Sequence, residues 1–163
     1  MKINERFTWA VDVLNIKPSD HLLEIGCGAG ILAEQIGGRL TAGTITAIDS
    51  SAAMIKIASR KNIANAHFIT SDFASAALPG NAYHKILAFN VNFFWKDPAT
   101  ELALIRKYLK RNGKLYVFYQ APYDITITAA KPIEEKLRSQ GYKIVDTIFK
   151  KLSPASAFCI VAT

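Results

Sequence analysis

The sequence has few cysteines and no long hydrophobic run. Its 163 residues contain two cysteines, Cys27 and Cys159, whose separation fits neither a metal-ligand spacing nor a disulfide framework. We expect both to be reduced structural thiols, and we predict no metal site. No apolar run approaches the ~20 residues that a membrane-spanning helix needs, and residues 1–17 lack the apolar core of a signal peptide. These absences predict a cytoplasmic protein that does not bind membranes.

Acidic side chains are outnumbered by basic ones. The chain has 13 Asp and Glu against 20 Lys and Arg, which gives a formal net charge of +7. Such an excess points either to an anionic partner such as RNA, or only to solubility and favourable charges at helix ends. Half of the residues are hydrophobic and a fifth are charged, so the chain is neither disordered nor fibrous. Length and composition together predict a single domain over residues 1–163.

Apolar periodicity and turn residues divide the chain into alternating helices and strands. The predicted helices span residues 4–15, 30–37, 51–60, 98–111 and 132–140, and the predicted strands span residues 21–26, 44–49, 67–70, 84–90, 114–120, 143–152 and 157–163. The last two strands are too close in sequence for a parallel crossover, so they must pair antiparallel. The earlier strands are nearly continuous apolar runs, as buried parallel strands require. These patterns predict an α/β fold with a mostly parallel sheet, helices on both faces and a reversed strand at the end.

Two finer predictions concern the helices. In the helix over residues 51–60, Met54, Ile57 and Ala58 are expected to face inward. Asp97 followed by Pro98 is typical of an N-cap with proline at the first helical position. That helix is expected to run to about residue 111 and to bury Leu109.

A glycine-rich turn follows the first predicted strand. In LLEIGCGAG, residues 22–30, Glu24 precedes glycines at 26, 28 and 30. Glycine allows a sharp strand-to-helix turn and a close approach between backbone and ligand. The dinucleotide pattern needs Gly or Ala where this chain has Ile31, which disfavours a nicotinamide-dependent oxidoreductase. Glu24 also suits a cationic ligand better than a pyrophosphate.

The pattern E-x-G-x-G-x-G resembles motif I of the class I S-adenosylmethionine-dependent methyltransferases, and the chain is similar to their small type 11/25 domains. The resemblance implies a Rossmann-like sheet of seven strands in the order 3-2-1-4-5-7-6. It also implies S-adenosylmethionine as cofactor and S-adenosylhomocysteine as product. The cofactor-binding residues expected on this basis are Glu24, Gly26, Cys27, Gly28, Gly30, Asp49, Ser50, Asp72, Phe73 and Asn90.

Three polar residues after predicted strands carry most of this expectation. Asp49 can accept hydrogen bonds from both ribose hydroxyls, although Asp49 or Ser50 could instead cap the next helix. In the family the acid at Asp72 typically meets the adenine amine and the residue after it, here Phe73, lines the ring; an Asx-turn is the alternative. Asn90 stands where motif IV faces the methionine part and the methyl group. The prolines of the N6-amino methyltransferases are missing after it, which disfavours that subfamily.

Histidine, the usual general base, is badly placed here. All three histidines precede or begin predicted strands, whereas ligands of open α/β sheets bind beyond the carboxyl ends. The sequence therefore leaves the catalytic residue unknown, with these candidates: Asn90, Tyr119, Tyr123 and Asp124.

The methyl acceptor is constrained only by charge placement. Most Lys and Arg residues fall near helix ends or strand starts, away from the predicted site, whereas an RNA reader needs them around it. This favours a small-molecule acceptor over RNA. An RNA methyltransferase, and a non-catalytic nucleoside-binding module that acts through a protein or RNA partner, stay as alternatives. The aromatic residues of NFFW, 92–95, could form a substrate wall, a cation–π surface for the sulfonium, or packing under the next helix.

Overall fold

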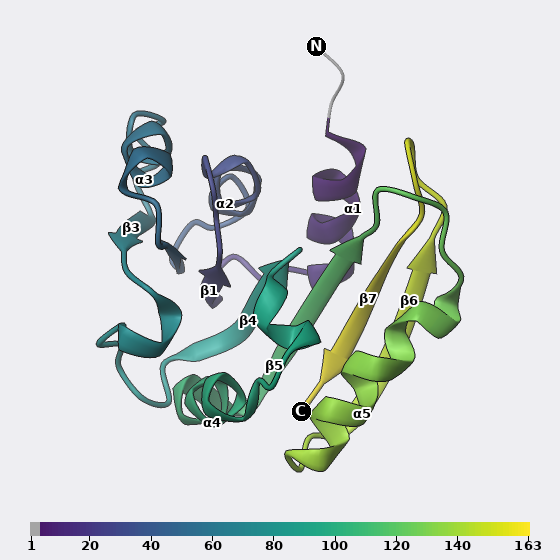
Figure 1. Cartoon of the computed structure of the whole chain (residues 1–163). Coiled ribbons are helices and arrows are strands. Elements are labelled where there is room, and N and C mark those ends of the chain that lie inside the picture. Colours follow the sequence, from purple (N-terminus) through teal and green to yellow (C-terminus); the bar gives the residue numbers. More distant parts are fainter. Residues whose placement is uncertain (1–3) are drawn as a thin grey trace.

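The computed structural model describes residues 4–163 (Figure 1). Its strands are β1 (His21–Ile25), β2 (Thr44–Asp49), β3 (Ala66–Thr70), β4 (Tyr83–Phe89), β5 (Leu109–Gln120), β6 (Ile144–Lys150) and β7 (Ala157–Ala162). Its α-helices are α1 (Glu5–Leu14), α2 (Ile31–Gly37), α3 (Ala52–Ser59), α4 (Ala99–Tyr108) and α5 (Lys131–Ser139). Short 3₁₀ helices are η1 (Phe73–Ser75), η2 (Asn92–Trp95) and η3 (Ile127–Ala130).

The strands form one seven-stranded sheet in the order β3-β2-β1-β4-β5-β7-β6. Strands β1 to β5 pair in parallel, while β7 runs antiparallel to both of its neighbours, β5 and β6. The predicted fold class, strand order and reversed last strand are therefore confirmed. The short link between β6 and β7 forces this reversal, since a parallel crossover needs a dozen or more residues.

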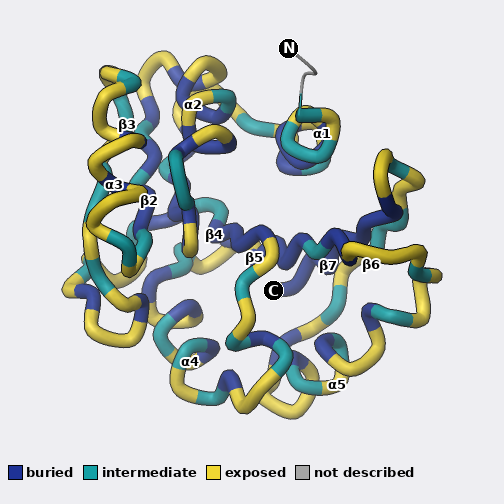
Figure 2. The backbone as a smooth tube through the Cα atoms, turned by 45° about the horizontal axis from the view of Figure 1, so that its top comes forward, coloured by how far each residue is buried: buried dark blue, intermediate teal, exposed yellow. Residues whose placement is uncertain are grey.

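Helices cover both faces of the sheet, and Figure 2 shows α1 and α2 on one side of it and α4 and α5 on the other. Successive strand residues alternate between the faces. Leu22 packs in the cluster that contains Trp9 and Leu32, whereas Leu23 packs in the cluster that contains Ile105. The inner strands β1, β4 and β7 are buried from both sides, whereas the edge strands β3 and β6 are only partly covered.

The boundary between α4 and β5 differs from the prediction. The helix ends at Tyr108, and residues 109–113 already belong to the strand, where Leu109 pairs with Tyr83 before a shift in register. A Cβ on Gly113 would lie 2.9 Å from the Tyr83 carbonyl oxygen, so the glycine permits this close pairing. The predicted helix end near 111, with Leu109 as a buried helical residue, is wrong because a long-range strand contact outweighs local helix propensity.

Two other helix predictions are corrected. Met54 and Ile57 are 38% and 44% exposed, while Ile55 and Ala58 are the buried residues of α3. Because α3 packs mainly on β2 and β3 at one end of the sheet, only a narrow stripe of it is covered. Helix α4 starts at Ala99 without a side-chain cap, so Asp97 does not act as the N-cap.

The histidines lie where the sequence placed them, at the starts of strands. His21 and His84 stack with ring centroids 5.7 Å apart, and the His21 amide donates to Nδ1 of His84. His67 is the second residue of β3. All three are at the amino edge of the parallel strands, which leaves the opposite, carboxyl edge for the site.

Candidate functional site

The glycine-rich turn is bound to the carboxyl end of β2. The amides of Gly26 and Cys27 both donate to the carbonyl oxygen of Ile48, at 2.8 and 3.0 Å. The Gly28 amide donates to Oδ2 of Asp49 at 2.8 Å. The turn and the end of β2 therefore form one hydrogen-bonded unit, and a ligand that contacts one of them meets the other.

Asp49 is held in place by main-chain donors on both sides. Its Oδ2 accepts from Gly28, and its Oδ1 accepts from the Ser51 amide at 2.9 Å. The N-cap of α3 is Ser51, whose hydroxyl accepts from the Met54 amide, so neither Asp49 nor Ser50 caps the helix. Each carboxylate oxygen has a second lone pair, so Asp49 can still accept hydrogen bonds from a ligand.

The three glycines of the turn meet different surroundings. A Cβ on Gly30 would lie 2.8 Å from the Cβ of Ala58, and one on Gly26 would lie 2.8 Å from the Val91 side chain. A Cβ on Gly28 would meet no atom within 4 Å. Gly26 and Gly30 are therefore needed for packing, while Gly28 keeps space open over the turn.

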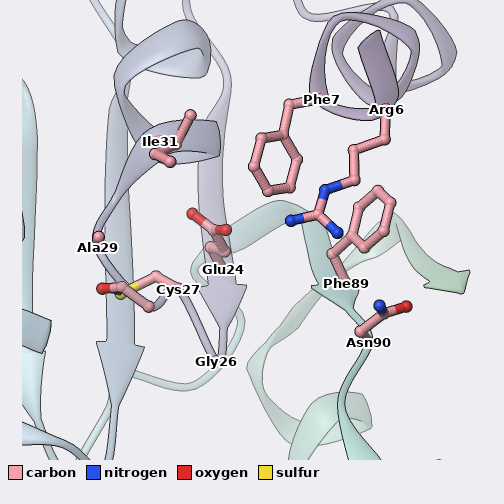
Figure 3. A pocket seen from close by; sticks show the side chains of 10 residues that line it. Arg6, Phe7, Glu24, Gly26, Cys27, Ala29, Ile31, Phe89 and Asn90 are labelled. Carbon is pink, nitrogen blue, oxygen red and sulfur yellow. Dashed lines mark hydrogen bonds between the residues drawn. The ribbon is translucent and has the colours of Figure 1, made fainter. Parts of the chain in front are cut away.

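The first of three hollows at the carboxyl edge is the Glu24 hollow, shown in Figure 3. Its lining residues are Arg6, Phe7, Glu24, Gly26, Cys27, Gly28, Ala29, Ile31, Phe89 and Asn90. The side chains of Glu24 and Arg6 reach into it from opposite sides (Figure 3). Within residues 4–163, Oε2 of Glu24 and Nε of Arg6 are buried and have no hydrogen-bond partner. A carboxyl group and a guanidinium group, each with one buried atom that lacks a hydrogen-bond partner, thus face the same space.

The electrostatics of this hollow follow from burial. Burial raises the pKa of Glu24 to about 8, and the negative charge of Asp49 adds to the shift. Burial likewise raises the pKa of the Cys27 thiol. The Arg6 guanidinium lies 4.6 Å from the centre of the Phe7 ring and 5.6 Å from that of Phe89, a cation–π arrangement. Near neutral pH the hollow therefore holds the Arg6 cation and a Glu24 carboxyl group that burial keeps mostly protonated.

The second hollow, the Asp49 hollow, adjoins the first at Gly26. It is lined by Ile25, Gly26, Ile48, Asp49, Ser50, Ser71, Asp72, Phe73, Val91 and Phe93. Phe73 is buried and stacks on Phe93 at 6.1 Å, while Asp72 is exposed. Asp72 makes no side-chain cap hydrogen bond to η1. Its carboxylate is therefore available at the rim of an apolar floor.

Asn90 joins the ends of β4 and β5. Its Oδ1 accepts from the Gln120 amide at 2.8 Å, and its Nδ2 donates to the Gln120 carbonyl at 3.2 Å. Asn90 has a positive φ of 56°, a conformation that asparagine tolerates better than most residues. The side chain holds two strands together, and one amide hydrogen remains for another acceptor.

The third hollow is the aromatic pocket, formed by Asn92, Trp95, Tyr119, Tyr123, Ile125 and Ala129. Two of the predicted catalytic candidates, Tyr119 and Tyr123, lie here, whereas Asp124 is exposed and lines none of these three hollows. Burial raises the pKa of Tyr119, and neighbouring Tyr123 raises it further. Tyr119 therefore keeps its proton near neutral pH and is not a base there.

Nine of the ten residues expected at the cofactor line the Glu24 hollow or the Asp49 hollow. The tenth, Gly30, belongs to the glycine turn but lines neither hollow. Five residues that line the Glu24 hollow were not among those expected: Arg6, Phe7, Ala29, Ile31 and Phe89. Arg6 comes from α1, and no motif in the sequence marks it. The one available signal was an arginine next to a phenylalanine at the start of an amphipathic helix.

Comparison with known proteins decides the family. The family model described as a methyltransferase domain matches residues 22–113, which include the glycine turn, Asp49, Asp72 and Asn90. The chain belongs to this methyltransferase family. It is a class I S-adenosylmethionine-dependent methyltransferase, and S-adenosylmethionine is its cofactor. The alternative of a nicotinamide-dependent oxidoreductase is therefore set aside.

The methyltransferase is 26% identical over 160 residues to the uncharacterized methyltransferase YdaC of Bacillus subtilis. This match covers 94% of this chain and 88% of YdaC. It is 34% identical over 100 residues to malonyl-[acyl-carrier protein] O-methyltransferase of Halalkalibacterium halodurans and 33% identical over 96 residues to trans-aconitate 2-methyltransferase of Delftia acidovorans. These matches cover 58% and 56% of this chain, and they span only 36% and 35% of the two relatives.

Among solved structures, the methyltransferase resembles a SAM-dependent methyltransferase from Aquifex aeolicus. The TM-score is 0.79 with 17% identity, and the match covers 96% of this chain and 88% of the other. This likeness concerns the fold. Within residues 4–163 no helix is long and apolar enough to span a membrane, and no three His, Cys, Asp or Glu side chains gather as a metal site.

Proposed function

We propose that this methyltransferase binds S-adenosylmethionine across the Glu24 and Asp49 hollows and methylates a small molecule. The main support is a pair of buried polar atoms without hydrogen-bond partners, Oε2 of Glu24 and Nε of Arg6, beside the glycine turn that is hydrogen-bonded to Asp49. When bound, S-adenosylmethionine supplies a methyl group on a positively charged sulfur. Its amino-acid end carries an ammonium and a carboxylate group, which complement Glu24 and Arg6.

The proposed roles of the remaining residues follow the order of the two hollows. Asp49 accepts hydrogen bonds from the ribose hydroxyls, with Ser50 beside it. Asp72 accepts from the adenine amine, and Phe73 packs along the ring. The backbone of Gly26, Cys27 and Gly28 forms the floor on which the ligand lies, Gly30 allows the turn to pack, and Asn90 borders the methionine end.

For catalysis we propose no general base. Methyl transfer is an in-line displacement, in which the enzyme gains most by alignment of the nucleophile with the departing sulfur. Tyr119 and Tyr123 lie on the acceptor side and can orient a nucleophile by hydrogen bonding. Asp124 is not given a role, since its side chain is exposed outside the three hollows.

A small-molecule acceptor is supported by the distribution of charge. The cations Lys85, Lys110 and Lys114 lie near strand starts, on the amino edge. RNA would need phosphate contacts around the carboxyl edge. The names of two relatives, a trans-aconitate methyltransferase and a malonyl-[acyl-carrier protein] methyltransferase, also favour acceptors other than RNA. We further propose that residues 1–163 act as one domain.

Calorimetry with two ligands tests the proposal. Arg6→Leu is expected to weaken binding of S-adenosylhomocysteine by about tenfold, roughly 1.4 kcal/mol, and to leave binding of 5′-methylthioadenosine, which lacks the amino-acid end, unchanged. Asp49→Ala is expected to weaken both ligands to a similar degree. The control is Arg39→Leu, which replaces an exposed arginine outside the hollows. Equal losses for both ligands in Arg6→Leu, or unchanged affinity in Asp49→Ala, would contradict the proposal.

A further inference from the structure

The segment from Asn90 to Trp95 borders all three hollows. Asn90 lines the Glu24 hollow, Val91 and Phe93 line the Asp49 hollow, and Asn92 and Trp95 line the aromatic pocket. Figure 3 shows Asn90 just beyond the end of β4, at the side of the Glu24 hollow away from the glycine turn. The aromatic pocket therefore begins at Asn92, directly after the chain has lined the Glu24 hollow with Asn90 and the Asp49 hollow with Val91.

The aromatic pocket has walls from three parts of the chain. Trp95 comes from η2, Tyr119 from β5, and Tyr123 from the segment that follows β5. The rings of Trp95 and Tyr119 meet edge to face with centroids 4.8 Å apart. Tyr123 is 64% exposed and stands at the open side. The pocket volume of about 440 Å³ is within the range of small-molecule sites.

The lining of the aromatic pocket carries no carboxylate, ammonium, guanidinium or imidazole group among the described residues. An anionic acceptor would lose hydration there without gaining a cation, which is unfavourable. An aromatic ring would instead gain edge and face contacts with Trp95 and the tyrosines. The Asn92 amide and the two phenol hydroxyls supply hydrogen bonds to one polar substituent.

We infer that the aromatic pocket is the acceptor site, and that it takes an uncharged aromatic molecule bearing a hydroxyl or amine nucleophile. The inference rests on the proposed function, which puts the methyl group beside Asn90. A lone pair of the acceptor oxygen or nitrogen forms the new bond to the methyl carbon. The carbon–sulfur bond breaks with its electron pair staying on sulfur, and the acceptor proton passes to water at the open side of the pocket.

The test uses two probes with the same ring, 2-naphthol and 2-naphthoate, titrated calorimetrically in the presence of S-adenosylhomocysteine. 2-Naphthol is expected to bind about tenfold more tightly than 2-naphthoate, because only the latter carries a charge. With S-adenosylmethionine, mass spectrometry is expected to detect 2-methoxynaphthalene. Tighter binding of 2-naphthoate, or binding of 2-naphthol without methylated product, would overturn the assignment.

Three variants locate the binding. Trp95→Leu and Tyr123→Ala are each expected to weaken 2-naphthol binding by about tenfold. Because Tyr123 is 64% exposed, its replacement leaves the core intact. Phe149→Leu, a half-buried aromatic packed on the same core cluster but outside the pocket lining, is the control and should bind normally.

The same titrations separate this inference from the proposed function. S-Adenosylhomocysteine affinity is measured first for each protein. If the protein without substitutions does not bind S-adenosylhomocysteine, the proposed function is contradicted. If it binds S-adenosylhomocysteine but Trp95→Leu and Tyr123→Ala bind 2-naphthol as tightly as it does, only the acceptor assignment is contradicted.

Discussion

Glu24 is an ionisable residue that is almost fully buried, with 3% of its surface exposed. Its side chain is buried, one carboxylate oxygen has no partner within residues 4–163, and Asp49 is close enough to raise its pKa. Burying a carboxylate in this way costs stability unless a partner compensates for it. A buried carboxyl group that lowers stability in this way is expected at a binding site, where a ligand supplies its missing partner. The proposed contact with the ammonium group of S-adenosylmethionine agrees with this expectation.

The pKa of Glu24 makes a prediction about stability. Since burial raises it from 4.5 to about 8, the folded state keeps a proton between these pH values that the unfolded state has lost. The free energy of unfolding should therefore fall as pH rises from about 4.5 to about 8, by roughly 1.4 kcal/mol for each pKa unit. Urea unfolding at pH 5 and pH 9 measures the loss.

The controls for this prediction are matched glutamate variants. Glu24→Gln should flatten the dependence, because the amide does not titrate. Glu135→Gln, at an exposed site on α5, should keep the slope of the unmodified chain. Equal slopes for Glu24→Gln and the unmodified chain would show that Glu24 is ionised normally in the folded state.

At the scale of elements, the paired hydrogen bonds of Asn90 join β4 to β5 beside the Glu24 hollow. Asn90, directly after β4, lines the Glu24 hollow, and Tyr119, in β5, lines the aromatic pocket. The relative position of the two strands therefore sets the distance between this hollow and the pocket. The side chain of Asn90 is thus a structural link as well as part of the lining.

Removal of this link should lower stability. Asn90→Ala is expected to reduce the free energy of unfolding by about 1–3 kcal/mol, through lost hydrogen bonds and the positive φ. Asn90→Gly should recover about 1 kcal/mol of that loss, because glycine adopts the conformation without strain. Chemical denaturation of both variants, with exposed Asn112→Ala as control, measures the difference. A glycine variant no more stable than the alanine variant would contradict the strain argument.

The elements also show where sequence patterns succeed. Strands β1, β2 and β4 were predictable because each is an apolar run between turn residues, and burial on both faces demands that pattern. The start of β5 was not predictable, because residues 109–111 continue the helix-favouring composition of α4. Only the pairing of Leu109 with Tyr83, distant in sequence, makes them a strand. The inward face of α3 was predicted only in part, since its coverage depends on the sheet below it: Ala58 is buried as predicted, whereas Met54 and Ile57 are exposed.

At the scale of the whole molecule, the parallel sheet gathers the site. Four polar residues of the site are far apart in sequence but lie at the carboxyl ends of neighbouring strands. Glu24 and Asp49 are among the last residues of β1 and β2, and Asp72 and Asn90 follow β3 and β4. The rule that ligands bind at this edge made them predictable together. Arg6 was not predictable in the same way, because α1 reaches the Glu24 hollow only through its packing against the folded sheet.

The most direct measurement is a crystal structure of this methyltransferase with S-adenosylhomocysteine. We expect the ribose hydroxyls to bind Asp49, the adenine ring to lie between Asp72 and Phe73, and the amino-acid end to lie between Glu24 and Arg6. The sulfur should face Asn90 and the aromatic pocket. A ligand bound elsewhere, or one whose amino-acid end points away from Glu24 and Arg6, would contradict this expectation.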